Sequence, residues 1–139
     1  MKNEKKQLKD FEVNVKIKIA ALWAVIMILY IYNDIYSLFK PGTLESMLAG
    51  KMGPFDVSQV GLFSGAVLMA IPAMMIFLSL VIKPQPNRIL NIIVSFVYIG
   101  VMVASLINEW YFYILMGVLE IACNVLIIIL SARWPKMNV

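Results

Sequence analysis

Residues 17–39 read IKIAALWAVIMILYIYNDIYSLF, an apolar run that contains Asn33 and Asp34 in its second half. A bilayer core about 30 Å thick is crossed by about 20 helical residues, so this run is long enough to span a membrane. No small-residue cleavage site follows it, which argues against a cleavable signal peptide. The stretch therefore predicts a transmembrane helix that carries a carboxylate.

The composition agrees with a membrane protein. Of the 139 residues, 62% are hydrophobic and 14% are charged, and the mean hydropathy is +0.86. Soluble domains are about 45–50% apolar and about 25% charged. A chain of this size cannot bury so much apolar surface in its own core. Lipid is therefore the expected solvent for most of the chain, and the bilayer its first partner.

Several function classes are disfavoured. The chain has no histidine, and so lacks the commonest general base and the commonest transition-metal ligand. We therefore predict no enzyme activity, no cofactor and no metal site. Its single cysteine, Cys123, excludes an internal disulfide. The net charge of +4 comes largely from an N-terminal tail without interleaved aromatic residues, which predicts no nucleic-acid partner.

Four apolar segments have the length of membrane spans, and turn residues separate them. They predict an all-α fold, a four-transmembrane-helix bundle with antiparallel neighbours. The domain organisation is a basic tail (1–16), one membrane domain (17–132) with an outer loop (40–58), and a second tail (133–139). The predicted spans are 17–39, 59–82, 89–107 and 111–132.

The outer loop has order of its own. Residues 43–49 predict a short helix that Gly50 ends. Asp56 and Gln59 have the spacing of a capping box, which predicts that the second span begins at Val57. The loop could act as a lid over the bundle or as a plain connector.

Basic residues flank the spans unequally, which predicts that both termini are cytoplasmic and that the chain lies in the cytoplasmic membrane. Only Lys40 and Lys51 lie on the opposite, outer side. The residues on the predicted inner side are Lys2, Lys5, Lys6, Lys9, Lys16, Lys18, Lys83, Arg88, Arg133 and Lys136.

Two carboxylates fall inside the spans, Asp34 and Glu120. Such a residue costs roughly 2.5–3.5 kcal/mol at the helix centre on insertion scales, so each needs a partner or a function. At about 1.5 Å per residue, Asp34 lies about 10 Å and Glu120 about 10–15 Å below the outer interface. We therefore expect both acids in one layer of the outer half.

Helical spacing places further polar or special residues with these acids. Pro72 leaves the Leu68 carbonyl without its usual amide partner. The expected faces are Trp23, Met27, Tyr30, Asp34 and Ser37; Gly61, Gly65 and Pro72; Asn91, Ser95, Tyr98, Met102, Ser105 and Glu109; and Tyr113, Gly117, Glu120, Asn124 and Ser131. From these we predict an ion or solute pocket of Asp34, Glu120, Tyr30, Asn33, Asn124, Tyr98 and Pro72.

No lysine or arginine lies within the membrane interior to neutralise either acid. We expect that one or both are protonated, share a proton or hold a cation. One interpretation is a proton- or cation-linked carrier or binder of a small polar solute, acting as a homodimer. The alternative is a structural or accessory subunit whose neutral acids bond helices together. Gly61 and Gly65, four residues apart, favour packing within the bundle over a dimer face.

The chain also resembles an uncharacterised family of small prokaryotic four-span membrane proteins, a domain of unknown function. The resemblance covers roughly residues 15 to 133 and implies four helices with the Asp34/Glu120 pair as their main feature. It implies no activity. It rests on YIYNDIYSL at 30–38 with Pro41 and Gly42, on Ile71, Pro72, Leu78 and Ser79, on Asn87, Arg88, Asn91 and Ile92, and on Glu120 and Ile121.

Overall fold

A computed structural model describes residues 10–136 of the chain. Its main elements are four long helices, each long and apolar enough to cross a membrane. The chain is thus a small multi-pass membrane protein, as the composition predicts. The elements are α1 (Val15–Ser37), α2 (Thr43–Leu48), β1 (Lys51–Met52), β2 (Phe55–Asp56), α3 (Gln59–Val81), α4 (Pro84–Ser105) and α5 (Tyr111–Ala132).

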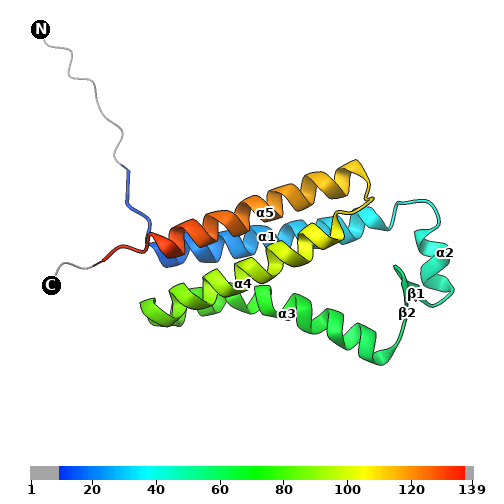
Figure 1. The fold of residues 1–139 in the computed structure, drawn as a ribbon, viewed down its shortest axis with the longest axis horizontal. Coiled ribbons are helices and arrows are strands. Elements are labelled where there is room, and N and C mark those ends of the chain that lie inside the picture. The colour runs from blue at the N-terminus through cyan, green and yellow to red at the C-terminus, as the bar shows by residue number, and fades with distance from the viewer. Residues whose placement is uncertain (1–9, 137–139) are drawn as a thin grey trace, which may run out of the picture.

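The four long helices run antiparallel to their neighbours (Figure 1). Helix α1 packs against both α3 and α5, and α5 packs against α4. Helix α3 meets α4 only sparsely, and Figure 1 shows it diverging from α4 toward α2 and the strands. We call the end with these short elements and the α4–α5 turn the loop end, and the opposite end the terminal end.

The helix ends follow from local chemistry. Asn14 caps α1, because its side chain accepts a hydrogen bond from the Lys16 amide at 2.9 Å. Helix α4 begins at Pro84, five residues before the predicted span, because a proline at the first helical position has no amide to leave unpaired. Helix α5 begins at Tyr111 as predicted. The tight turn before it places Asn108 in the left-handed region, with φ of 60°.

The loop differs from the all-α prediction by one small hairpin. β1 pairs antiparallel with β2, and Lys51 forms an ion pair with Asp56. The capping box predicted at Asp56 is therefore wrong, because that residue is extended and its carboxylate is engaged. Ser58 caps α3 instead, accepting from the Gly61 amide at 3.0 Å. The predicted short helix is confirmed as α2, and Gly50 follows it with φ of +76°.

The predicted contribution of Gly61 and Gly65 to packing within the bundle is wrong for Gly65. A Cβ at Gly65 would meet nothing within 4 Å, and one at Gly61 would meet only its neighbours Ser58 and Asp56. The divergence of α3 leaves this face without a partner helix from the described chain. Close packing occurs instead at Gly117 on α5, where an added Cβ would approach Leu106 to 2.6 Å.

The surface of the bundle is more apolar, and its interior more polar, than is usual in a soluble protein. Large apolar side chains such as Ile31, Phe63 and Phe77 are exposed on the outside of the bundle. Apolar side chains also form the core, but much of the remaining interior is polar. The core comprises Ile19, Trp23, Ile26, Tyr30, Met75, Tyr98, Met102 and Ile127.

Candidate functional site

Buried polar side chains form two groups along the bundle. In lipid, each such group must find a partner inside the protein, because the hydrocarbon offers none. At the terminal end, Ser79, Asn87 and Asn91 have partners and the Ser131 hydroxyl has none, whereas farther along the bundle Asn33, Ser95, Glu120 and Asn124 each have a side-chain oxygen without a partner among the described residues. The buried polar residues are Asn33, Ser79, Asn87, Asn91, Ser95, Glu120, Asn124 and Ser131.

At the terminal end, Asn91 joins three helices. Its side-chain oxygen accepts hydrogen bonds from the Trp23 indole at 2.7 Å and from the Ser79 hydroxyl at 3.2 Å. Its amide group donates to the side chain of Asn87 at 2.6 Å. Asn87 in turn donates to the Ser79 carbonyl at 2.7 Å. These contacts link α1, α3 and α4 and leave the Asn91 side chain fully engaged.

Lys16 completes this end of the bundle. Its ammonium donates to the Leu80 carbonyl at 3.2 Å and to the Ile82 carbonyl at 2.7 Å, near the C-terminus of α3. The last carbonyls of a helix have no intrahelical partner, and a cation is favourable there. The contacts of Asn87, Asn91 and Lys16 therefore hold the terminal end together, which is a structural role, although the buried Ser131 hydroxyl at this end has no partner among the described residues.

Toward the loop end, Glu120 lies fully buried in α5. Neither of its carboxyl oxygens has a hydrogen-bond partner among the described residues, and the same holds for the side-chain oxygens of Asn124 and Asn33. The Asn124 amide donates to the Glu120 backbone carbonyl at 3.0 Å, so it does not reach the carboxyl group. Glu120 is the only acid among the buried side chains of the described residues whose oxygens have no partner.

A small cavity of about 110 Å³ lies in the same half of the bundle. Its lining contains three tyrosines and one acid, and it contains no lysine or arginine. The lining residues are Tyr30, Asn33, Asp34, Leu68, Met69, Tyr98, Val101, Met102, Ser105 and Tyr113.

The two acids approach this cavity differently. Asp34 lines it and is exposed, whereas Glu120 is fully buried and does not line it. The predicted inner face of α1 is confirmed at Trp23 and Tyr30, which are buried, and is wrong at Asp34, because the buried stripe continues through Asn33. One residue rotates a side chain by about 100° around a helix of 3.6 residues per turn.

Pro72 does not line the cavity, but it affects two residues that do, Leu68 on α3 and Tyr98 on α4. It is buried in the middle of α3, and the Leu68 carbonyl that it deprives of an amide accepts a hydrogen bond from the Tyr98 hydroxyl. The carbonyl expected to be free is therefore paired. Because Leu68 and Tyr98 both line the cavity, this bond fixes one wall of it.

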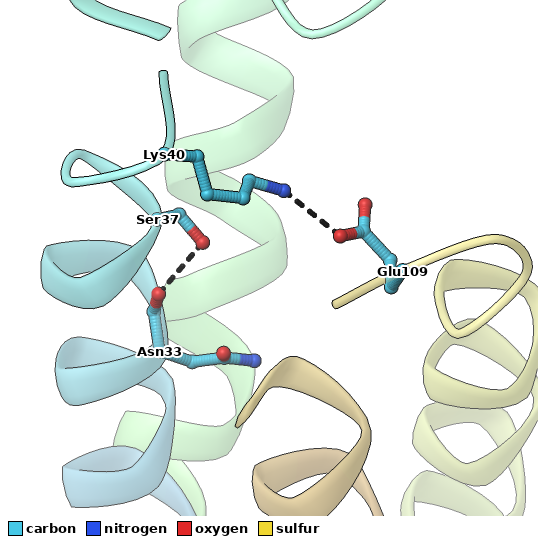
Figure 2. Close-up of polar contacts among 4 residues, drawn as sticks. All are labelled: Asn33, Ser37, Lys40 and Glu109. Carbon is cyan, nitrogen blue, oxygen red and sulfur yellow. Dashed lines mark hydrogen bonds and ion pairs between the residues drawn. The ribbon is translucent and has the colours of Figure 1, made fainter. Parts of the chain in front are cut away.

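An ion pair lies beyond the cavity, at the loop end. The Lys40 ammonium contacts the Glu109 carboxylate at 2.8 Å and lies 5.8 Å from the centre of the Tyr113 ring. Figure 2 shows Lys40 reaching from the chain after α1 to Glu109 in the α4–α5 turn. In the same view, the Ser37 hydroxyl donates to the Asn33 carbonyl at 2.8 Å. The ion pair ties two connections together above the cavity.

Four of the seven predicted pocket residues line the cavity: Tyr30, Asn33, Asp34 and Tyr98. The other three do not line it: Glu120 is buried in α5, Asn124 lies one helical turn after it, and Pro72 frees the carbonyl of the lining residue Leu68. Sequence reasoning left Ser105, Met102 and Tyr113 out of the pocket, although the helical spacing placed them on inward faces. It also missed Asn87, which continues the four-residue spacing of Asn91 and Ser95 and was recognisable on that basis.

Comparison with known proteins adds a family but no activity. Neither the curated proteins nor the solved structures contain a match to this chain. A family model, however, matches almost the entire sequence. The predicted resemblance to a family of unknown function is thereby confirmed. The chain belongs to the Family of unknown function (DUF6326), whose model matches residues 7–139.

Proposed function

We propose that this membrane protein is a non-catalytic carrier or binder that holds a proton or a small cation in the loop half of its bundle. The observation that carries the proposal is Glu120, fully buried with both carboxyl oxygens unpartnered among the described residues. An ionised carboxylate in that position is costly unless something compensates its charge. Since the cavity in this half of the bundle is lined by a second acid, Asp34, and by no lysine or arginine, the compensating group is a proton or a cation.

A structural or accessory role is the second candidate. The network of Trp23, Asn91 and Asn87 supports it, because these buried groups do link helices. Glu120 differs from them in forming no side-chain hydrogen bond to another described residue. Interhelical bonding therefore accounts for the terminal end of the bundle and does not account for Glu120.

We place the terminal end in the cytoplasm and the loop end outside the cytoplasmic membrane, so that the cavity lies in the outer half. The described basic residues at the terminal end include Lys83, Arg88 and Arg133, against Lys40 and Lys51 at the loop end. The tail lysines Lys2, Lys5, Lys6 and Lys9, which contribute to the same prediction, lie outside the described residues.

We further propose a homodimer, because four spans are few for a carrier. The open face at Gly65 supports a second helix there, since small residues at this spacing allow helices to approach closely. The oligomeric state can be determined from the mass of the protein–detergent complex. A protein that stays monomeric at all concentrations would contradict the proposed homodimer.

Thermal stability in detergent tests the proposed ion site. We expect the midpoint of the wild type to change between about pH 5 and pH 9 or with added Na⁺ or K⁺, because the charge of the buried acids must be compensated. Asp34→Asn and Glu120→Gln should remove that dependence. Glu45→Gln, which removes an acid of α2 outside the four long helices, should leave it unchanged. A flat wild-type profile with fully tolerated amides would support the structural role and exclude the ion site.

A further inference from the structure

The cavity of the proposed ion site presents aromatic rings and hydrogen-bond acceptors. Tyr30, Tyr98 and Tyr113 supply the rings, and Asp34 supplies a carboxylate. The Asn33 side-chain oxygen is unpartnered among the described residues, in a side chain that is 3% exposed. A ligand here meets negative charge, π-faces and lone pairs.

The hydroxyl protons of this lining are partly committed elsewhere. The Tyr98 hydroxyl donates to the Leu68 carbonyl, and the Ser105 hydroxyl donates to the Val101 carbonyl at 2.9 Å. Each hydroxyl has one proton, so toward the cavity these two oxygens can only accept. Together with the Asp34 carboxylate, these acceptors favour a positively charged ligand.

No basic side chain of the described chain fulfils this role inside the cavity. The nearby ammonium of Lys40 lies 5.8 Å from the Tyr113 ring centre, but it is held by Glu109 at 2.8 Å and does not line the cavity. Its position nevertheless shows that Tyr113 tolerates an ammonium group close to its ring, at a distance typical of cation–π contacts.

The volume of the cavity and the side chains that line it indicate which kind of cation would fit. A cavity of about 110 Å³ holds roughly four water-sized groups, at about 30 Å³ each. Tyrosine rings attract ammonium groups through their quadrupole, whereas a bare alkali ion prefers a shell of six or so oxygen ligands. Two methionines, Met69 and Met102, add apolar surface suited to methyl groups.

We propose, building on the ion site of the proposed function, that the cavity binds a small organic ammonium ion of about four or five non-hydrogen atoms. Asp34 compensates its charge, the rings of Tyr30, Tyr98 and Tyr113 enclose it, and the Asn33 oxygen accepts from it when it carries N–H groups. Glu120 does not line the cavity and does not touch the ligand.

Calorimetric titration of the full chain in detergent tests this assignment with two probes, tetramethylammonium chloride and propylammonium chloride. tert-Butanol serves as the uncharged control, because it has the shape of tetramethylammonium without its charge. We expect both ammonium ions to bind and tert-butanol not to bind. Equal binding of tert-butanol would overturn the proposal, since the cavity would then recognise apolar shape alone.

Substitutions identify the recognising groups. Tyr113→Leu should weaken tetramethylammonium binding about five- to thirtyfold, the range expected for one cation–π contact. Tyr113→Phe should retain binding, because the ring is kept. Tyr111→Leu is the matched control, since Tyr111 is 92% exposed on the same helix and does not line the cavity. Asp34→Asn should reduce the affinity at least about tenfold through the lost charge.

The outcomes separate this proposal from the one on which it rests. If the stability responds to pH or Na⁺ through Asp34 and Glu120 but neither ammonium ion binds, the ion site stands and the organic cation is excluded. If Tyr113→Phe loses binding as fully as Tyr113→Leu, the hydroxyl rather than the ring is the ligand, which overturns the aromatic recognition. If no cation and no pH change affects the wild type, both proposals fail.

Discussion

At the scale of single residues, Asn91 and Ser95 on α4 are both buried but differ in their hydrogen bonding. Both are fully buried. Asn91 accepts from Trp23 and Ser79 and donates to Asn87, whereas the Ser95 hydroxyl has no partner among the described residues. A hydrogen bond in a membrane protein contributes little on average, but an unpaired buried group is costly.

Replacing these two residues should therefore have unequal effects. Asn91→Leu should lower the free energy of unfolding by about 1–3 kcal/mol, because it leaves the Trp23 indole N–H and the Asn87 side-chain oxygen unpaired. Ser95→Ala should leave it unchanged or raise it, since the substitution removes a buried hydroxyl that bonds no described residue. Chemical denaturation in detergent, followed by tryptophan fluorescence, measures both. Equal losses in the two variants would contradict the account of Asn91 as the link between helices.

Residue-level prediction from sequence is limited by rotation around the helix. A stripe at steps of three and four identified Asn91, Tyr98, Glu120 and Asn124 as inward-facing, and all four are buried. The same reasoning chose Asp34 where Asn33 is buried. Neighbouring residues differ by about 100°, and an apolar stripe is at least that wide, so the pattern alone does not separate them.

At the scale of elements, α4 and α5 form the most closely packed hairpin. Gly117 lies where they approach, and a Cβ there would lie 2.6 Å from Leu106 and 2.8 Å from the Met102 sulfur. Gly100, on α4, has nothing within 4 Å of the same construction. An added methyl group therefore changes both side-chain packing and backbone flexibility at Gly117, but only backbone flexibility at Gly100.

We expect Gly117→Ala to destabilise the protein and Gly100→Ala to be neutral or stabilising. Overpacking costs about 1–3 kcal/mol, which outweighs the gain in helix propensity of about 1 kcal/mol when the neighbours resist displacement. Thermal unfolding in detergent compares the pair. If Gly117→Ala were as stable as Gly100→Ala, the side chains of Leu106 and Met102 would have to move aside at little cost.

Element positions were predicted more fully than element contacts. Hydropathy and turn residues give four spans, and the structure has four, with starts within five residues of those expected. The divergence of α3 has no signal in the local sequence. The same is true of the Lys40–Glu109 ion pair, because its two residues are 69 positions apart. Such contacts depend on how helices pack, which a single sequence constrains weakly.

At the scale of the whole molecule, the orientation in the membrane is testable by labelling. In a Cys123→Ser background, Lys51→Cys at the loop end should react with a membrane-impermeant maleimide added to intact cells. Lys136→Cys at the terminal end should react only after the cells are lysed, because the excess of basic residues lies on that side. The reverse pattern of labelling would invert the orientation and place the cavity in the cytoplasmic half.

The divergence of α3 has a consequence for how the bilayer itself acts on the cavity. Helix α3 has 23 residues, about 34 Å at 1.5 Å per residue, and so exceeds an average hydrocarbon thickness of about 30 Å. A helix that is too long tilts, and a thinner bilayer makes it tilt further. Because Tyr98 holds the Leu68 carbonyl, tilting would pivot the free half of α3 about that bond. The width of the cavity would then follow the thickness of the surrounding lipid.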